Sequence, residues 1–343
     1  MDTTLPAVEV IIPHYRDPDR LRLCLDSLSK TRYPSMTVLV VDNGSGNPEL
    51  QTMLSGFSGM RLLTLSANLG YAGGCNAGFS ASSAPYLVFM NDDTRQDPSW
   101  LEQLVAAAQS NARIAALQPK ILSLQAHAEG RNIFDHAGAA GGMLDLLGYP
   151  WCYGRTFSGV EEDRGQYDAS RNIFWASGAA MLVRRSVFEE IGGFDDTFFM
   201  HMEEIDLCWR MQLAGYLVRS EPSSVVWHEG GASLAQGSAR KIYFNHRNNL
   251  TMLVKNLGLP RLLMALCFRL LLEPAAAVFY LLKGAGGAAG AIAVMHASAD
   301  FLVRLPGTVR SRCRVQPLRK VADRKLLAGL PFAVLLLRRR QFS

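Results

Sequence analysis

Three polar residues, Asn91, Asp92 and Asp93, directly follow the apolar run from Tyr86 to Met90. Side chains at the carboxyl end of a central strand face the crevice in which an open α/β sheet binds its ligand. Neighbouring carboxylates there suit a hard divalent cation, which binds phosphate in turn. An Asn/Asp turn that simply closes the strand explains the same residues. The fragment by itself leaves both interpretations open.

Apolar, β-branched runs alternate with helical patterns in the first part of the chain, and this order predicts a parallel, doubly wound α/β sheet. The expected strands cover 8–13, 37–41, 61–65 and 86–90, and the expected helices cover 20–30 and 73–83. The carboxyl ends of parallel strands line one crevice, which a nucleotide would fill. We therefore expect one ligand to be faced by Pro13, Asp42, Asn68 and Asp93.

A glycine-rich stretch, 73–78, lies just before the fourth strand. It lacks the Lys-Ser/Thr pair of a P-loop and the glycine spacing of a dinucleotide fingerprint. Close packing of a helix on the sheet explains the glycines better than direct phosphate contact does.

Acidic residues reappear in the second half, in the segment from Phe198 to Arg210. Glu203, Glu204 and Asp206 have helical spacing, so the positive end of the helix dipole explains any one of them. Capping does not require all three. Further on, His228 follows a short apolar strand, where a lone histidine is more often structural than a ligand.

The motifs together resemble the GT-A-fold family 2 glycosyltransferases, and the rhamnosyltransferase-like branch fits best. The resemblance covers roughly residues 8–256 and depends on the order and spacing of four segments rather than on any one motif. These segments are Ile12-Pro13-x-Tyr15, Val41–Ser45, Asn68–Gly78 and Asn91–Asp93.

The resemblance implies a nucleotide-diphosphate sugar as donor and a divalent cation, Mg²⁺ or Mn²⁺, as cofactor. It places Asp42 at the base or ribose, Asp92 near the ribose and the donor sugar, and Asp93 and His228 on the metal. Asn91 departs from the acidic residue of many relatives, which puts its metal contact in doubt. The donor site as a whole is expected to include Pro13, Tyr15, Asp42, Asn68, Gly70, Gly74, Asn76, Asn91, Asp92 and Arg247.

In the resembled family an acidic pair carries the general base of inverting transfer on its second member. Glu204 takes that position here, with Glu203 as the runner-up. The acceptor side is expected to include Trp175 and Gly178, with Asp206 as a support for the base. Arg247 follows the family histidine, where it either meets the diphosphate or belongs to a solvated helix face. The Gln-x-x-Arg-Trp motif of processive synthases is absent after Glu204, which favours transfer of a single sugar.

Composition limits the alternatives. The chain has 343 residues, of which 49% are hydrophobic and 19% charged, so it has enough apolar residues for a large globular core. Its six cysteines show no Cys-x-x-Cys spacing, which argues against a zinc site or a disulfide framework. The start, Met1–Pro6, lacks the features of a secretory signal, so we expect a reducing, cytoplasmic setting. An aromatic interval, 125–171, is expected to form a loop or small hairpin near the acceptor.

The last part of the chain, 257–343, combines apolar helical segments with a basic tail. Between Arg304 and Arg340 there are eleven Arg or Lys residues against the single acidic residue Asp323. Charges interrupt each apolar segment, so amphipathic helices lying in a membrane surface explain the pattern better than spanning helices do. The segment 335–340 has the same character. Packing on the catalytic domain or a homo-oligomer interface remains an alternative, and the lack of interleaved aromatic residues disfavours nucleic acid.

The sequence therefore predicts an α/β, GT-A (Rossmann-like) protein whose mostly parallel central sheet is flanked by helices. Residues 1–256 are expected to form the transferase domain, and residues 257–343 an apolar and basic helical extension. Within the transferase domain, the nucleotide-sugar half is expected at about 1–120 and the acceptor half at about 121–256. The expected activity is inverting, metal-dependent transfer of one sugar, L-rhamnose from dTDP-rhamnose, to a polyprenyl-linked saccharide or polysaccharide. Its expected place is the cytoplasmic face of the membrane, bound peripherally. The alternatives are a non-catalytic sugar-binding or scaffold subunit and a nucleotidyltransferase.

Overall fold

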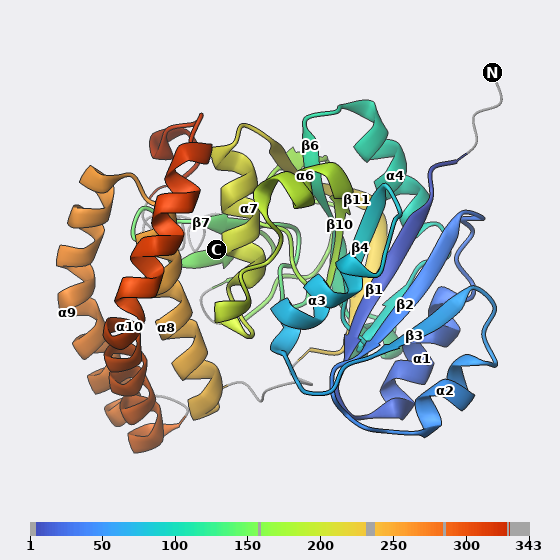
Figure 1. Cartoon of the computed structure of the whole chain (residues 1–343), viewed down its shortest axis with the longest axis horizontal. Helices are drawn as coiled ribbons and strands as arrows, with labels where there is room; N and C mark the ends of the chain where they lie inside the picture. Colours follow the sequence, from blue (N-terminus) through green and yellow to red (C-terminus); the bar gives the residue numbers. More distant parts are fainter. Residues whose placement is uncertain (1–4, 157–158, 231–236, 284–285, 328, 330–343) are drawn as a thin grey trace.

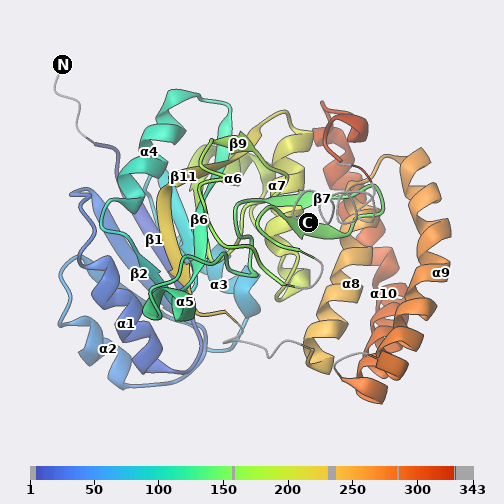
Figure 2. The same cartoon turned by 180° about the vertical axis from the view of Figure 1, so that it is seen from behind.

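The computed structural model describes residues 5–156, 159–230, 237–283, 286–327 and 329. Its main element is a mixed nine-stranded sheet with helices on both faces, and a layer of long helices lies at one end (Figures 1 and 2). The strands of this sheet are β1 (Val8–His14), β2 (Met36–Asp42), β3 (Met60–Thr64), β4 (Tyr86–Met90), β5 (Thr94–Gln96), β6 (Ile114–Ser123), β9 (Arg171–Asn172), β10 (Ala180–Arg184) and β11 (Leu217–His228).

The helices alternate with the strands through the first two thirds of the chain and then follow one another. They are α1 (Pro18–Leu28), α2 (Glu49–Leu54), α3 (Gly70–Ser80), α4 (Trp100–Ser110), α5 (Leu124–Ala128), α6 (Arg185–Ile191), α7 (Glu203–Leu213), α8 (Ala239–Asn256), α9 (Leu259–Lys283) and α10 (Gly287–Val315). Three 3-10 helices, Asp196–Phe198, Gln316–Leu318 and Asp323–Lys325, complete the described part.

The order of the strands is β3-β2-β1-β4-β10-β6-β11-β5, and β9 pairs with β11. Strands β1 to β4 are parallel to one another, as expected from the alternating pattern. Strand β10 lies between β4 and β6 and is antiparallel to both. Strands from both expected halves therefore share one sheet, which is mostly parallel on one side of β10 and mixed on the other.

Buried apolar side chains cover both faces of the sheet. On one face, Leu21 and Leu25 of α1 and Trp100 of α4 pack with Val10 and Val88. The other face packs against α3, α6 and α7 and continues without a break toward α8. Central strands buried on both faces explain why their sequences read as continuous apolar runs rather than as alternating patterns.

The glycines of α3 let that helix approach the sheet closely. A Cβ on Gly78 would lie 2.3 Å from Cγ2 of Ile11, and one on Gly74 would lie 3.0 Å from Cβ of Pro13. This is the close packing expected for the glycine-rich stretch. The aromatic interval forms a two-stranded hairpin of β7 (Gly142–Leu144) and β8 (Pro150–Cys152), which lies outside the main sheet.

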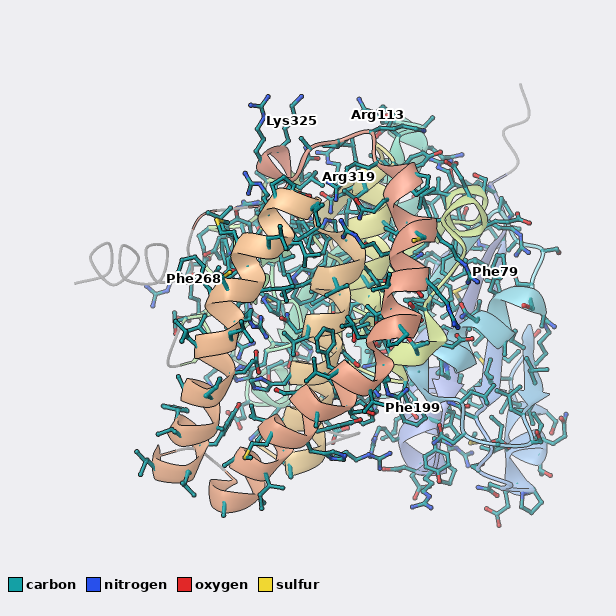
Figure 3. All side chains as sticks on the ribbon, turned by 60° about the vertical axis from the view of Figure 1, so that its left-hand side comes forward. Phe79, Arg113, Phe199, Phe268, Arg319 and Lys325 are labelled. Atoms are coloured by element: carbon teal, nitrogen blue, oxygen red, sulfur yellow. The ribbon has the colours of Figure 1, made fainter. Side chains whose placement is uncertain are left out.

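The C-terminal helices form a separate layer in which α10 packs on both α8 and α9 (Figure 1). Two segments of this layer, Leu259–Leu282 and Gly287–Leu318, are long and apolar enough to cross a membrane by length and composition, with mean hydropathies of 1.9 and 1.3. Many of their large apolar side chains are exposed, and Phe268 projects outward from α9 (Figure 3).

Candidate active site

The carboxyl ends of β1, β2 and β4 bring polar side chains together at one edge of the sheet. His14, the last residue of β1, pairs in register with Asp42, the last residue of β2. The Nδ1 atom of His14 lies 2.7 Å from Oδ2 of Asp92, which follows β4. Burial raises the pKa of Asp92, although the contact with His14 opposes this. His14 was not predicted from the sequence, because a single buried histidine inside an apolar strand gives no signal.

A second set of contacts shapes the loop beyond β2. The carboxylate of Asp42 is almost fully buried and accepts a hydrogen bond from the backbone N–H of Ser45 at 2.8 Å. Asn43 bridges to the turn before α3, because its Oδ1 accepts from Leu69 N at 2.9 Å and its Nδ2 donates to Gly70 O at 2.8 Å. Asn43 lies in the segment that resembles the family, but sequence reasoning gave it no role.

Gly70 and Asn68 form the turn itself. Gly70 has a φ of 73°, and a Cβ at this position would lie 2.2 Å from the carbonyl oxygen of Phe199. Asn68 Oδ1 accepts a hydrogen bond from Gly70 N at 2.8 Å. The expected donor residues Asn68 and Gly70 therefore shape the backbone between β3 and α3, and Gly70 also allows the segment before α7 to approach.

Asp93 and His228 meet as predicted for a metal pair. Their Oδ1 and Nε2 atoms are 3.1 Å apart, and both side chains are 5% exposed. Asn91 lies beside them, with Nδ2 3.4 Å from His228 Nε2. The other ring nitrogen of His228, Nδ1, lies 2.9 Å from Oδ1 of Asp135. Asp135 was missed because it lies in the irregular segment after β6, where no sequence pattern marks it.

The electrostatics of this group are strongly coupled. Burial opposes a charge on His228, but the carboxylates of Asp93 and Asp135 outweigh it and raise the pKa of His228 to about 10. The pKa of Asp93 is lowered, since the attraction of His228 outweighs the effect of burial. A proton on Nε2 of His228 thus lies between this nitrogen and Oδ1 of Asp93, at the place that a cation bound by both atoms would take.

The arrangement of Asp93 and His228 fits a divalent cation. Adjacent ligands of an octahedral ion with bonds of 2.0–2.1 Å lie about 3 Å apart, which is the separation of these two atoms. Within the described ranges no group of three or more His, Cys, Asp and Glu side chains is placed to hold a metal. A two-residue site of this kind suits an ion that takes its remaining ligands from water and from phosphate.

The acidic pair lies at the start of α7, after a backbone segment in unusual conformations. Phe199, His201 and Met202 have φ values of 64°, 66° and 74°. The side-chain amide of Asn248, on α8, donates to the carbonyl oxygens of Phe198 at 3.0 Å, Met200 at 2.8 Å and His201 at 2.7 Å. Non-glycine residues in the left-handed region store strain, and such strain gathers at functional sites. Asn248 supports the segment that precedes Glu203.

Arg247 differs from its expected role. Its guanidinium is buried and donates to the carbonyl oxygens of Thr197 at 3.0 Å and Phe198 at 2.9 Å. It also bonds the side chain of Asn248 at 2.6 Å. These contacts satisfy the guanidinium inside the protein, so Arg247 is not the free diphosphate-binding cation that we expected. From its position on α8, Arg247 instead bonds the carbonyl groups that lead into the strained segment before Glu203.

Glu203 and Glu204 have perturbed acidities. Burial raises the pKa of Glu204 to about 7. Burial and the neighbouring charge of Glu204 raise the pKa of Glu203 well above its usual value. Each carboxyl has a buried Oε2 atom without a hydrogen-bond partner among the residues that the structure describes. Near neutral pH Glu204 can therefore gain or lose a proton, as a general base requires, and the raised pKa of Glu203 favours its protonated form.

The segment before the acidic pair contacts the carboxyl edge of the sheet. Phe199 O accepts a hydrogen bond from Ala72 N at 3.4 Å, beside the turn at Gly70. Tyr71 donates from Oη to Gly178 O at 2.7 Å, and the next residue, Ala179, accepts from Asn91 N at 3.1 Å.

Three further expected residues take structural roles. Asp206 is fully buried and accepts from Arg210 at 2.8 Å, Lys255 at 3.0 Å and Asn256 at 2.8 Å, so it anchors α7 and is not available to an acceptor. The indole of Trp175 is 6% exposed and donates to Met143 O at 3.0 Å, which makes it a core residue instead of an acceptor-binding surface.

Asn76 is the third residue of this kind. Its side chain exchanges hydrogen bonds with the backbone of Phe194 at 2.9 and 3.0 Å, which joins α3 to the segment before α7. Tyr15, in contrast, is 41% exposed just beyond β1, and Pro13 is partly exposed next to Gly74. Pro13 and Tyr15 thus lie at the carboxyl edge of the sheet, as expected. Asp206, Trp175 and Asn76 instead lie in the interior and support the elements around them.

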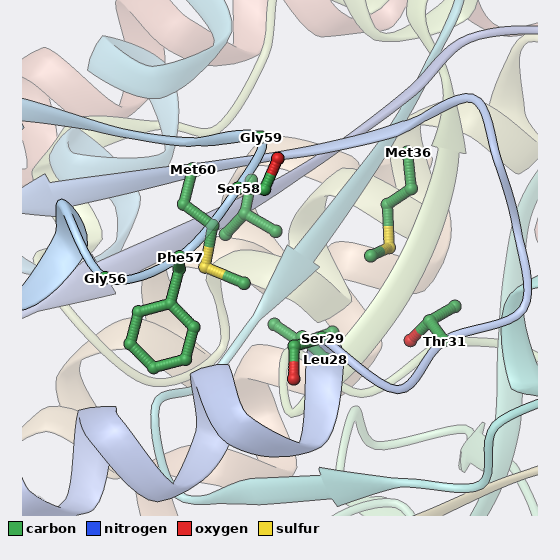
Figure 4. Close-up of a pocket in the computed structure, with 10 residues that line it drawn as sticks. Leu28, Ser29, Thr31, Met36, Gly56, Phe57, Ser58, Gly59 and Met60 are labelled. Carbon is green, nitrogen blue, oxygen red and sulfur yellow. The ribbon is translucent and has the colours of Figure 1, made fainter.

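A separate small pocket lies at the opposite edge of the sheet (Figure 4). It has a volume of about 330 Å³, and its lining includes Met36 at the start of β2, Met60 at the start of β3, and Phe57. It contains none of the carboxylates or histidines described above. The chemistry is therefore concentrated at the carboxyl edge.

Known proteins resemble this chain in sequence and in fold. Residues 9–192 match the model of the family described as Glycosyl transferase family 2. The chain is 30% identical over 259 residues to the N-acetylglucosaminyl-diphospho-decaprenol L-rhamnosyltransferase of Mycobacterium tuberculosis (strain ATCC 25618 / H37Rv), and the match covers 72% of this chain and 83% of that protein. It is 31% identical over 245 residues to the O-antigen biosynthesis protein RfbC of Myxococcus xanthus, which covers 70% of this chain but 18% of RfbC.

Solved structures share the fold at low sequence identity. The structure of GalNAc-T7 with UDP, GalNAc and Mn²⁺ superposes with a TM-score of 0.56 and 16% identity, over 73% of this chain and 48% of that one. The structure of S. aureus TarS 1-349 with UDP superposes with a TM-score of 0.51 and 14% identity, over 81% of this chain and 73% of that one. The chain thus spans about half of GalNAc-T7 and under a fifth of RfbC.

The position of Asp135 yields a test of the metal site. We expect Asp135→Asn to weaken Mn²⁺ binding by about 10- to 100-fold, because the amide no longer orients His228 as an anion does. The affinity is measured by titrating Mn²⁺, followed by electron paramagnetic resonance, with dTDP present. Asp26→Asn, near the C-terminal end of α1, is the matched control. Equal Mn²⁺ affinity in Asp135→Asn and the wild type would contradict the assignment.

Proposed function

The chain belongs to glycosyltransferase family 2, and from this premise we propose that it transfers a single sugar, with inversion, from a nucleotide-diphosphate donor to a lipid-linked acceptor. The observation that carries the proposal is the proximity of two kinds of group. A pair of atoms with metal-ligand spacing, on Asp93 and His228, is supported by Asp135. The segment that leads into Glu204, a residue whose pKa is raised to about 7, contacts the turn at Gly70 on the same edge of the sheet. Inverting transfer needs both a leaving-group site and a base.

The donor is held at the carboxyl edge of the sheet. Asp42 faces the nucleoside, Asp92 the ribose and donor sugar, and Asp93 with His228 the cation. When bound, that cation neutralises the negative charge that develops on the departing diphosphate. His14 holds Asp92 through its Nδ1, and Asn43 fixes the turn at Gly70, so the edge is rigid before the donor binds.

Glu204 acts on the acceptor. Its carboxylate takes the proton of the attacking hydroxyl group while the hydroxyl oxygen bonds to the anomeric carbon and the bond to the diphosphate oxygen breaks. Attack from the face opposite the diphosphate inverts the configuration. The raised pKa of Glu203 favours its protonated form, which places no second charge beside the base. The strained segment 199–202 fixes the direction in which Glu204 points.

The proposed sugar and acceptor rest on the similarity of this chain to a relative whose name states both. A relative that matches over 83% of its length is named as an L-rhamnosyltransferase acting on a diphospho-decaprenol saccharide. We accordingly propose L-rhamnose from dTDP-rhamnose as donor, a polyprenyl-linked saccharide as acceptor, and a role in cell-surface glycan biosynthesis.

The C-terminal layer gives support for membrane association. The charged residues of α9 between Leu262 and Leu282 are Arg269 and Glu273, and both are buried. Arg269 donates to Glu273 at 2.8 Å, and His246 of α8 lies 2.5 Å from the same carboxylate. The outer surface, here called the α9–α10 apolar face, consists of Leu263, Phe268, Leu270, Leu271, Val278, Phe279, Leu281, Leu282, Ile292, Met295, Leu302 and Val303.

On these helices the charged side chains face the protein and the apolar side chains face outward. Helices of this kind suit a position in the surface of a bilayer, with their polar side against the protein. Exposed cations such as Arg314 and Lys320 lie at the far end of α10, where Lys325 projects from the molecule (Figure 3). Such cations favour anionic lipid. The segment 335–340, for which the sequence predicts the same amphipathic character, lies outside the described residues. We propose that the enzyme is a peripheral protein of the cytoplasmic membrane face.

Donor binding tests the proposal directly. We expect isothermal calorimetry to show that dTDP-rhamnose binds in the presence of Mn²⁺, and that EDTA or Asp93→Ala abolishes this binding, because the diphosphate loses its counter-charge. UDP-glucose and GDP-mannose serve as comparison donors. Metal-independent binding would contradict the Asp93 assignment, and preference for another nucleotide would replace the proposed donor.

The base is tested separately. We expect Glu204→Gln to leave donor affinity nearly unchanged and to lower kcat/KM by at least about 100-fold, because an amide accepts no proton. In the wild type, kcat/KM should rise with pH through about 7, as Glu204 loses its proton, and should fall toward acidic pH. Glu189→Gln on the exposed face of α6 is the control. Full activity of Glu204→Gln would refute this role.

Membrane binding is expected to depend on the α9–α10 apolar face. The pair Leu270→Glu and Leu271→Glu should weaken binding to vesicles of phosphatidylglycerol and phosphatidylethanolamine by at least about tenfold, since burying one leucine contributes about 1.5–3 kcal/mol. Co-sedimentation measures the effect. Leu23→Glu, at a 52% exposed leucine of α1, provides the matched control. Undiminished binding of the double variant would exclude this face as the contact.

A further inference from the structure

Two adjacent carboxylates, Asp92 and Asp93, turn to different partners at the carboxyl edge of the sheet. Oδ2 of Asp92 lies 2.7 Å from Nδ1 of His14, at the end of β1. Oδ1 of Asp93 lies 3.1 Å from Nε2 of His228, at the end of β11. Strands β1 and β11 are not neighbours in the sheet. The two side chains are therefore drawn apart, although they are consecutive in the sequence.

The backbone that carries the two carboxylates is fixed by other contacts. The N–H of Asn91 bonds the residue before β10 at 3.1 Å, and its carbonyl oxygen accepts from the hydroxyl of Thr94 at 2.9 Å. The carbonyl oxygen of Asp93 accepts from the residue after β11 at 3.0 Å. None of these bonds involves His14. The contact of His14 with Asp92 therefore orients a side chain and not the turn itself.

The surroundings of His14 favour one tautomer. Its side chain is fully buried and lies on the face of β1 that also carries Val10 and Ile12, which pack against α1. An ionised carboxylate only accepts hydrogen bonds, so Nδ1 donates to Asp92. Nε2 is buried without a partner among the residues that the structure describes. A bare nitrogen suits this place better than an N–H group, because unsatisfied buried donors are rare.

The contact with His14 uses one oxygen of Asp92 and leaves the other for a ligand. Oδ1 has no hydrogen-bond partner in the described part of the chain, and the side chain is 16% exposed. Asp42, which pairs in register with His14, ends the neighbouring strand at the same edge. A carboxylate held in one orientation accepts a hydrogen bond from a sugar hydroxyl without reorganising first.

The same contact opposes rotation of Asp92 toward the candidate metal pair. A divalent cation attracts each carboxylate that can reach it, and its affinity rises with the number of charged ligands. A cation bound by both aspartates would attract the donor diphosphate less, because its charge would be more fully neutralised. Bonding of Oδ2 by His14 keeps the second carboxylate away from the cation.

We propose that His14 is a positioning residue that directs the Asp92 carboxylate to the hydroxyl groups of the donor and keeps it off the cation at Asp93 and His228. This inference rests on the proposed function, which places Asp92 at the ribose and the donor sugar. It assigns two consecutive carboxylates to two different tasks. Because His14 is fully buried, it acts on the donor through Asp92 and not by direct contact.

A double-mutant cycle on the full-length protein tests this role by calorimetry. His14→Leu fills the buried position without a hydrogen-bond donor, and it should weaken binding of dTDP-rhamnose with Mn²⁺ by about tenfold, the loss typical of one hydrogen bond to a charged group. In an Asp92→Ala background, the same change should alter the affinity by less than about twofold, because its effect passes through Asp92.

Two further variants separate positioning from packing. His14→Asn places an amide N–H at the same point of the side chain as Nδ1, so it should restore most of the donor affinity. Ile12→Val, at a buried position on the same face of β1, is the packing control and should leave the affinity unchanged. Circular dichroism confirms that each variant is folded.

A titration of Mn²⁺ without nucleotide, followed by electron paramagnetic resonance, tests the second half of the inference. His14→Leu should bind Mn²⁺ at least about threefold more tightly than the wild type, since the released Asp92 can turn to the ion. A general loss of structure would weaken Mn²⁺ binding instead.

The outcomes are distinct. Equal losses of donor affinity from His14→Leu with and without Asp92 would overturn the inference, and so would unchanged or weaker Mn²⁺ binding in His14→Leu. If dTDP-rhamnose does not bind the wild type, the proposed donor fails. The Mn²⁺ titration then decides the inference by itself, and tighter binding by His14→Leu supports it.

Discussion

The contact of His228 with two carboxylates is the interaction on which the active edge depends. Asp93 belongs to the turn between β4 and β5, His228 ends β11, and Asp135 lies in the segment after β6. One imidazole therefore ties together three segments that are far apart in the sequence. Buried carboxylates repel each other unless a cation lies between them, so the proton on His228, or a metal beside Asp93, is needed to hold this arrangement. A positive charge at this position therefore both stabilises the local fold and keeps the carboxylate of Asp93 in place.

A second constraint acts on the acidic pair. The segment before α7 contains three non-glycine residues at positive φ, a conformation that costs free energy unless its surroundings impose it. The amide of Asn248 and the guanidinium of Arg247 bond its carbonyl groups, while Asp206, Arg210 and Lys255 fix the body of α7. The buried polar network thus fixes the backbone that leads into Glu203 and Glu204 and the body of the helix on which they lie.

Local sequence predicted the strands β1 to β4 and the edge that they share, because buried parallel strands read as apolar runs with polar ends. It also placed Asp93 and His228 together, through the family resemblance. It did not predict that β10 inserts antiparallel between β4 and β6, since strand order is set by long-range pairing. His14, Asn43 and Asp135 were missed, and the roles of Arg247 and Trp175 were misjudged, because whether a polar side chain is free or already bonded depends on partners distant in sequence.

Helix α8 connects the C-terminal helix layer to the segment that precedes the acidic pair. Four consecutive residues point to two different neighbours: His246 and Asn249 bond the buried charges of α9, whereas Arg247 and Asn248 bond the segment before Glu204. Because both sets of contacts come from a single turn, a shift of α8 relative to α9 would disturb the carbonyl groups that precede Glu203. Arg269 and Glu273 turn inward to make these bonds, which leaves the outer face of α9 apolar. The same ion pair therefore helps to fix α8 and leaves only apolar side chains on the outer face of this part of α9.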